Sequence, residues 1–173
     1  MPDQQGGDSG PAFPYIRRKP ATGTAGRHAM QPIAIRLYGD RVMVGIVLVS
    51  HSQTLAQGAA ELATQIAGGV VPVIPAGGTA DGRLGTSAEL IAAAIASADK
   101  GDGVVLIPDL GSAVLSARAL LADLDVTASG SSLVLVDAPF VEGAVAAAAA
   151  ASGGLDLAAV AAAAEEARDA RKL

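Results

Sequence analysis

The stretch Val42-Met-Val-Gly-Ile-Val-Leu-Val-Ser-His51-Ser52 decides the fold class of this chain. Its apolar residues run without the polar alternation of a sheet that has one face in water, which is typical of a strand buried on both faces. Residues 52–67 then carry apolar side chains at helical spacing: Leu55, Ala59, Leu62, Ala63 and Ile66. Two glycines directly follow and mark the end of this expected helix. A buried strand that passes at once into a helix predicts a parallel α/β fold.

Strand and helix patterns alternate along the rest of the chain. Short apolar strands are expected at residues 70–74, 103–108 and 132–136. With helices between them, this order predicts a three-layer, doubly wound α/β/α fold around a mainly parallel four-stranded sheet. The pattern itself leaves the strand order open.

The expected helices carry recognisable end signals. Thr86 opens one helix, and Thr86 with Glu89 fits a capping box. Another helix is expected at residues 112–124. Two alanine-rich helices follow, divided by a Gly-Gly pair, and Asp156 is the expected N-cap of the last.

The first 42 residues differ from the rest of the chain. They hold most of the nine prolines and most of the aromatic residues, and they show no convincing periodicity. Such a segment buries too little apolar surface to offset the entropy of ordering it. We therefore expect a disordered or weakly structured extension at residues 1–42 and a domain at residues 43–173, with Met43 as the hypothetical start of the functional part.

Composition and charge exclude several classes of function. A net charge of −5 and only 2% aromatic residues disfavour nucleic-acid binding, which needs a basic face and platforms for stacking bases. The absence of cysteine excludes thiolate catalysis and disulfides. No segment reaches the roughly 20 apolar residues that span a bilayer, and no apolar export region follows Arg17 and Arg18. We expect a cytoplasmic protein that binds neither nucleic acid nor membrane.

His51 is the candidate nucleophile. Ligands of open α/β sheets bind outside the carboxyl ends of the strands, and His51 directly follows the first strand. A neutral imidazole nitrogen accepts a phosphoryl group, and a helix N-terminus binds the phosphate. A capping or partly buried histidine without chemistry explains the position equally well. His28, in the irregular leader, is interpreted as incidental.

Asp109 and three hydroxyl residues are the other candidates. If the first and third strands are neighbours, Asp109 can accept a hydrogen bond from one ring nitrogen of His51 and leave the other nitrogen free to attack. A turn or capping aspartate is the alternative. Thr86, Ser87 and Ser112 are candidate phosphate ligands at helix N-termini, although capping alone explains them.

Metal and nucleotide sites find no support in the sequence. Four carboxylates of the folded part have no spacing typical of metal ligands: Asp81, Asp102, Asp137 and Glu142. No metal is therefore assigned. The glycine-rich residues 77–86 lack the lysine of a P-loop, and no Gly-x-Gly-x-x-Gly follows the first strand. No cofactor is expected.

Four segments occur in order at the expected strand and helix junctions: Val47-Leu-Val-Ser-His51-Ser52, Gly85-Thr86-Ser87, Asp109-Leu-Gly-Ser-Ala-Val-Leu-Ser-Ala117 and Ala138-Pro-Phe-Val-Glu-Gly143. Together they resemble the DhaM family, the phosphotransferase subunit of phosphoenolpyruvate-dependent dihydroxyacetone kinase. The resemblance covers about residues 43–173. It implies a mannose-type EIIA-like domain, strand order 2-1-3-4, a homodimer, and Asp109 as the partner of His51.

The resemblance also implies a phosphoryl relay. His51 accepts phosphate from HPr and passes it to ADP bound on the DhaL subunit, for transfer to dihydroxyacetone on DhaK. Some family members carry fused HPr-like domains; because this chain ends at Leu173, a separate HPr is expected. The alternatives are a mannose-class EIIA component of sugar transport and a non-catalytic regulatory α/β module.

Overall fold

The computed structural model describes residues 43–123 and 132–173, so the extension expected at residues 1–42 lies outside the described part. The strands are β1 (Gly45–Ser50), β2 (Val73–Gly77), β3 (Val104–Pro108) and β4 (Leu133–Leu135). The helices are α1 (Gln53–Ile66), α2 (Ala88–Ala98), α3 (Gly111–Asp123), α5 (Phe140–Ser152) and α6 (Leu157–Glu166), followed by a 3-10 turn, η1 (Ala167–Asp169).

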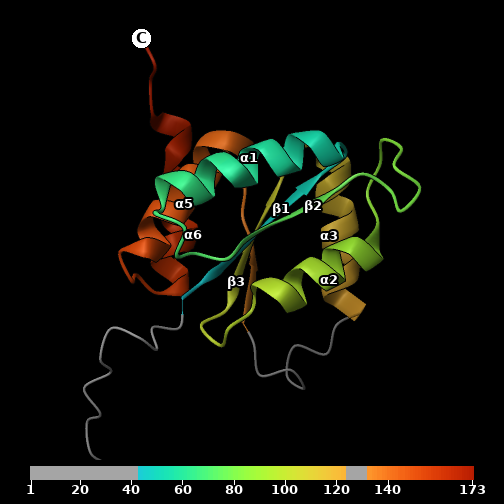
Figure 1. Cartoon of the computed structure of the whole chain (residues 1–173), viewed down its shortest axis with the longest axis horizontal. Helices are drawn as coiled ribbons and strands as arrows, with labels where there is room; N and C mark the ends of the chain where they lie inside the picture. The colour runs from blue at the N-terminus through green and yellow to red at the C-terminus, as the bar shows by residue number, and fades with distance from the viewer. Residues whose placement is uncertain (1–42, 124–131) are drawn as a thin grey trace, which may run out of the picture. The chain divides into compact units, whose positions relative to one another are not determined.

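The four strands form one parallel sheet in the order β2-β1-β3-β4. Helices α1, α5 and α6 cover one face of it, and α2 and α3 cover the other (Figure 1). The three-layer α/β/α prediction is therefore confirmed, and so is the strand order that the family resemblance implies. Central β1 pairs with β2 and β3, which brings the ends of these strands to one edge of the sheet.

The core explains why β1 lacks polar alternation. Ile46 and Leu48 pack into the cluster beneath α1, α5 and α6, whereas Val47 and Val49 pack into the cluster beneath α2 and α3. All four side chains are fully buried. Since successive side chains of a strand point to opposite faces, a strand covered on both sides needs apolar residues throughout.

Helix α1 forms where expected, but its large apolar residues do not lie on its buried face. Leu55, Leu62 and Ile66 are 44%, 45% and 54% exposed. The buried face is alanine, at Ala56, Ala59, Ala60 and Ala63. The helix lies so close to the sheet that only small side chains fit beneath it; an added Cβ on Gly77 of β2 would lie 2.8 Å from the Ala56 methyl.

Strand β2 begins three residues later than the expected 70–74. Gly68 and Gly69 both have positive φ and continue the turn after α1. The ladder starts only where the Pro72 carbonyl accepts a hydrogen bond from Ile46. Because β2 is an edge strand, Pro75 is tolerated within it although proline has no N–H to donate.

The capping box expected at Thr86 and Glu89 is wrong. Helix α2 is capped by Ser87, whose hydroxyl accepts a hydrogen bond from the Leu90 amide. Glu89 is therefore one residue too close to the cap for the reciprocal contact. The expected cap of α6 is confirmed, because Asp156 accepts a hydrogen bond from Ala159 at 2.9 Å.

Two further observations concern the described residues alone. None of the helices within residues 43–123 and 132–173 is both long enough and apolar enough to cross a membrane. The same residues contain no group of three or more His, Asp or Glu side chains that could hold a metal ion.

Candidate functional site

The site lies where β1 and β3 end side by side. Val49 of β1 is paired with Pro108 of β3, so the next residues of both strands emerge at the same edge of the sheet. The Asp109 amide also donates to the Val49 carbonyl at 2.9 Å. Parallel pairing therefore brings His51 and Asp109 together although they are 58 positions apart in the chain.

The His51 ring is oriented by Asp109. Nδ1 lies 2.9 Å from Asp109 Oδ1, and the His51 backbone N–H donates to Oδ2, also at 2.9 Å. An ionised carboxylate accepts hydrogen bonds only, so Nδ1 carries the ring proton and Nε2 keeps its lone pair. The His51 side chain is 24% exposed and that of Asp109 only 7%. The site thus presents one ring nitrogen, Nε2, for chemistry.

Hydrogen bonding keeps Asp109 in its charged form. Burial raises the pKa of this carboxyl, but the bonds from the His51 amide, the His51 ring and the Ser50 hydroxyl together outweigh it and hold the pKa below its ordinary value. Asp109 is therefore a carboxylate near neutral pH, which is the state that fixes the tautomer of His51 and stabilises positive charge on its ring.

Ser50 is a member of the site that the sequence argument did not single out. Its hydroxyl donates to Asp109 Oδ2 at 2.8 Å and accepts the Ser52 amide at 3.0 Å. Among the described residues, it is the only polar residue that is buried. The one signal in the sequence is a hydroxyl at the end of an otherwise apolar strand, directly before the candidate histidine.

Ser112 contacts the other nitrogen of the ring. Its Oγ lies 2.6 Å from His51 Nε2. With the ring proton on Nδ1, the hydroxyl is the donor of this bond. Ser112 is the second residue of α3, and the first amides of a helix have no intrahelical acceptor. The helix N-terminus that meets Nε2 is therefore that of α3.

Thr86 and Ser87 do not contact the His51 ring. The Thr86 hydroxyl is hydrogen-bonded to Ser116 Oγ at 2.7 Å, and Ser116 in turn donates to the Ser112 carbonyl at 3.3 Å. Ser87 caps α2. Of the three expected phosphate ligands, the structure brings only Ser112 to the histidine. Thr86 is connected to Ser112 indirectly, by hydrogen bonds through Ser116.

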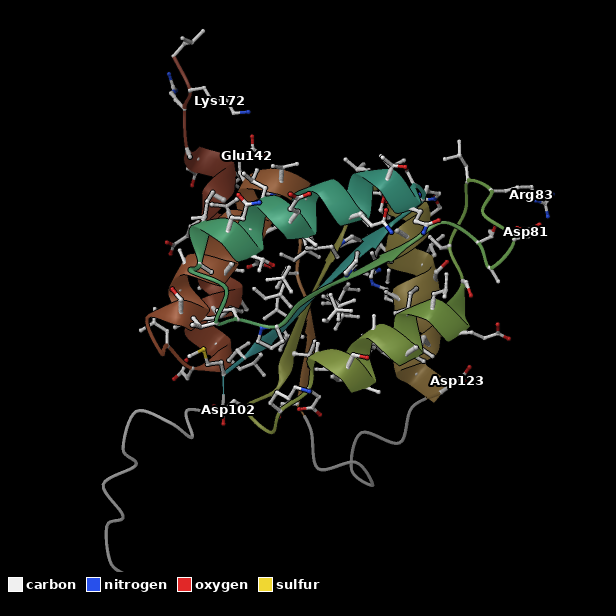
Figure 2. The ribbon with its side chains drawn as sticks, viewed as in Figure 1. Asp81, Arg83, Asp102, Asp123, Glu142 and Lys172 are labelled. Atoms are coloured by element: carbon white, nitrogen blue, oxygen red, sulfur yellow. The ribbon has the colours of Figure 1, made fainter. Side chains whose placement is uncertain are left out.

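The loop between β2 and α2 is fastened to the site by its backbone. The Gly85 amide donates to the His51 carbonyl at 3.0 Å. Farther out, Arg83 Nε donates to Asp81 Oδ2 at 2.7 Å, and both side chains lie in the exposed loop (Figure 2). Arg83 is thus paired with Asp81, and no hydrogen bond joins it to the His51 ring.

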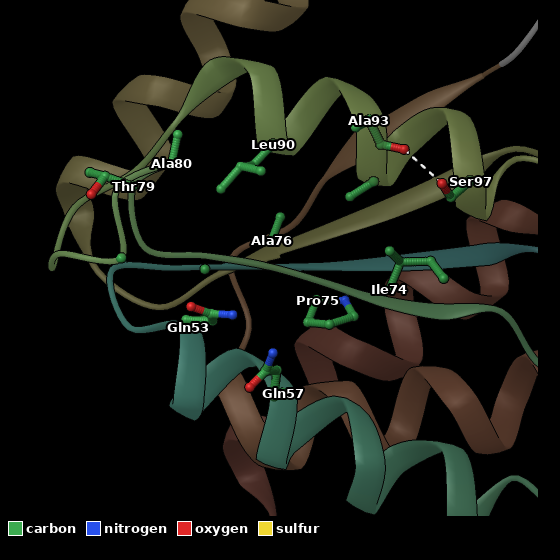
Figure 3. A pocket seen from close by; sticks show the side chains of 13 residues that line it. Gln53, Gln57, Ile74, Pro75, Ala76, Thr79, Ala80, Leu90, Ala93 and Ser97 are labelled. Atoms are coloured by element: carbon green, nitrogen blue, oxygen red, sulfur yellow. Dashed lines mark hydrogen bonds between the residues drawn. The ribbon is translucent and has the colours of Figure 1, made fainter.

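A groove of about 400 Å³ lies along the open edge of β2 (Figure 3). Gln53 and Gln57 of α1 line one side, Leu90 of α2 lines the other, and Pro75 lies between them. The lining contains no charged side chain and neither His51 nor Asp109. The groove is therefore separate from the histidine site.

A parallel α/β domain with a histidine and an aspartate at the carboxyl edge of its sheet defines a class of protein, which sequence comparison identifies. Residues 45–161 match the EIIA-man family, described as the PTS system fructose IIA component, and the chain belongs to this family. His51, Asp109 and Ser112 all lie within the matched residues.

Curated relatives share a common name. The chain is 45% identical over 106 residues to a Listeria innocua protein named PEP-dependent dihydroxyacetone kinase 2, phosphoryl donor subunit DhaM; the match covers 61% of this chain and 84% of the relative. It is 41% identical over 118 residues to the DhaM subunit of Providencia stuartii, covering 66% of this chain and 24% of that protein. The chain therefore spans most of one relative and about a quarter of the other.

A solved structure has the same fold. The crystal structure of the unknown-function protein EF1359 aligns with a TM-score of 0.65 and 37% sequence identity, covering 72% of this chain and 94% of that one.

Proposed function

We propose that His51 carries a phosphoryl group on Nε2 and that this protein is the phosphoryl donor subunit of a phosphoenolpyruvate-dependent dihydroxyacetone kinase. One observation carries the proposal: Nδ1 of His51 is held by Asp109 while Nε2 faces Ser112, in a chain 45% identical to a DhaM subunit. A histidine that only caps a helix needs no such division of its two nitrogens. The non-catalytic alternative is accordingly less well supported.

The proposed chemistry moves a phosphoryl group from a donor nitrogen to Nε2 of His51 and then to an acceptor oxygen. The lone pair of Nε2 attacks the phosphorus of a phosphorylated donor, and the donor's phosphorus–nitrogen bond breaks as the new bond forms. Positive charge develops on the His51 ring and faces the Asp109 carboxylate through the Nδ1 proton. In the second step an acceptor oxygen attacks the same phosphorus, and Nε2 recovers its lone pair.

Ser112 and the start of α3 are the proposed phosphate ligands. The Ser112 oxygen stands 2.6 Å from Nε2, so it has to rotate aside when a phosphoryl group occupies that position. After rotation its hydroxyl can donate to a phosphoryl oxygen, together with the first amides of α3. Ser87 is left as a helix cap, and Thr86 supports Ser112 through Ser116.

The partners follow from the family resemblance. We propose HPr as the phosphoryl donor, ADP bound on DhaL as the acceptor, and DhaK as the subunit that presents dihydroxyacetone, all in the cytoplasm. The names of the relatives support the dihydroxyacetone kinase system as a whole. A homodimer is part of the same proposal, and sedimentation equilibrium tests it directly.

The second candidate is an EIIA component of sugar transport. It is favoured by the description of the matching family, which names a fructose IIA component. The donor half of the reaction is the same in both cases, and the acceptor distinguishes them. Phosphorylated protein should lose its label to ADP-loaded DhaL if the first proposal holds, and to a sugar-specific EIIB protein if the second holds.

Labelling from phosphoenolpyruvate tests the donor step. With enzyme I and HPr present, the protein should acquire an acid-labile, alkali-stable phosphate. The label should vanish in His51→Ala and persist in His28→Ala, a matched control because the chain has only two histidines. Labelling that survives His51→Ala would overturn the proposed function.

A further inference from the structure

The Ser50 hydroxyl is placed to act on Asp109. Asp109 Oδ1 receives the ring of His51, whereas Oδ2 receives two donors, the His51 amide and the Ser50 hydroxyl. Both oxygens are thus held, and the carboxylate has no freedom to rotate away from the ring without breaking one of these bonds. Ser50 itself is 0% exposed, so its hydroxyl is shielded from bulk water.

We propose that Ser50 is a positioning residue of the phosphoryl-transfer site, whose hydroxyl holds the Asp109 carboxylate in the orientation that fixes the His51 ring. Ser50 touches neither ring nitrogen, so it acts only through Asp109. Its part in transfer rests on the proposed function, whereas its hold on Asp109 does not.

The direction of the hydroxyl proton is determined by its surroundings. The Ser52 amide donates to Ser50 Oγ, which uses a lone pair of that oxygen. The hydroxyl proton is then directed at Asp109 Oδ2, an acceptor-only atom when the carboxyl is ionised. The Ser52 amide also belongs to the N-cap residue of α1, so the same hydroxyl ties the start of this helix to the carboxylate.

A purely structural role is the competing explanation. In that explanation, Ser50 is needed only as the acceptor for the Ser52 amide at the start of α1. The two roles differ in what their loss changes. A structural role affects the stability of the fold, whereas a positioning role changes the titration of Asp109 and the tautomer of His51 in protein that remains folded.

Nuclear magnetic resonance of full-length variants separates the two roles. In Ser50→Ala, the pKa of Asp109, followed by its carboxyl ¹³C shift, should rise toward its ordinary value because one of three donors is lost. The fraction of His51 with its proton on Nδ1, followed by ring ¹⁵N shifts, should fall. Phosphoryl transfer from HPr should slow about three- to tenfold, the effect of one ordinary hydrogen bond.

Ser52→Ala is the matched control. It removes the hydroxyl that caps α1 and accepts the Leu55 amide, but it keeps the backbone N–H that binds Ser50. This variant should lose stability at the same place without moving the Asp109 titration or the His51 tautomer. Ser50→Cys keeps a donor at this position, although a weaker and larger one, and should give effects on the Asp109 titration between those of serine and alanine.

The outcomes are distinct. A folded Ser50→Ala with an unchanged Asp109 titration and an unchanged His51 tautomer overturns the proposal. If Ser50→Ala does not fold, the same titrations are measured on Ser50→Cys, and the wild-type protein supplies a second test. In the wild-type protein, the nuclear magnetic resonance signal of the buried Ser50 hydroxyl proton should shift as Asp109 titrates. A signal that stays constant overturns the proposal. If the Asp109 titration moves but His51 is never phosphorylated, the hold on Asp109 stands and the proposed function fails.

Discussion

At the scale of the residue, the two nitrogens of the His51 imidazole have different hydrogen-bond partners. Asp109 takes Nδ1 and Ser112 takes Nε2, with bonds of 2.9 and 2.6 Å. Because the carboxylate fixes the proton on Nδ1, the lone pair of Nε2 faces Ser112. The ionised form of Asp109 therefore determines which tautomer His51 adopts.

Replacing Asp109 by asparagine removes this control. We expect Asp109→Asn to slow phosphorylation of His51 by roughly 10- to 100-fold, because a hydrogen bond to a charged group contributes about 1.5–3 kcal/mol. Rapid-quench labelling from phosphorylated HPr measures the rate, and circular dichroism checks that the fold persists. An unchanged rate would remove Asp109 from the mechanism.

The lowered pKa of Asp109 has a consequence for stability in acid. A carboxyl whose folded-state pKa lies below the unfolded value of 3.8 stabilises the fold above that value, and the contribution is lost as the pH falls through the folded pKa. We expect the unfolding free energy of the wild-type protein to fall more steeply than that of Asp109→Asn below about pH 5. Urea titrations at several pH values measure both slopes, and parallel slopes would contradict the assignment.

At the scale of the element, the start of α1 is held by its close contact with the end of β2. An added Cβ on Gly77 would lie 2.5 Å from the Ser52 carbonyl oxygen and 2.9 Å from the Gln53 Cα. These residues directly follow His51. The approach of a helix to a strand, and not only the side chains of the site, thus determines where the histidine is.

Two glycines near this junction should respond in opposite ways to alanine. Gly77→Ala forces α1 away from β2, and we expect it to cost about 1–3 kcal/mol of unfolding free energy and to slow transfer. Gly58, in the middle of α1, has nothing within 4 Å of an added Cβ. Gly58→Ala should therefore stabilise the fold by about 0.5–1 kcal/mol and leave transfer unchanged. Urea denaturation and the labelling assay compare them; equal effects would contradict the close contact.

At the scale of the whole molecule, the buried apolar side chains of residues 43–123 and 132–173 form two clusters, one on each face of the sheet. All buried residues of the two clusters lie between Val44 and Ala164.

Deletion of residues 1–42 tests the expectation that residues 43–173 are the functional domain. We expect the chain that begins at Met43 to unfold cooperatively with the same midpoint in urea as the full chain and to be labelled on His51 at the same rate. The full-length protein under identical conditions is the control. A shortened chain that is unfolded or inactive would show that the first 42 residues belong to the functional domain.

Several features were readable from local patterns. The unbroken apolar run of β1 predicted a strand buried on both faces, and the alternation of strands and helices predicted the α/β/α layers. His51 could be nominated because it directly follows that strand. Local patterns did not predict where some elements begin or which face of a helix is buried. Strand β2 starts later than expected, Ser87 and not Thr86 caps α2, and α1 buries alanines while its leucines remain exposed. These features depend on which elements pack together.

The sequence by itself therefore determined the class of fold and nominated His51 as the candidate histidine, because burial and periodicity are properties of consecutive residues. Only the tertiary structure decided which nitrogen of the His51 ring carries the proton and which keeps its lone pair. That outcome depends on β1 and β3 being neighbours, because their pairing brings Asp109 next to His51 although the two are 58 positions apart. The same pairing lets the Ser50 hydroxyl donate a hydrogen bond to the Asp109 carboxylate. Strand order arises from pairing between distant segments, so it has no signature in any one of them.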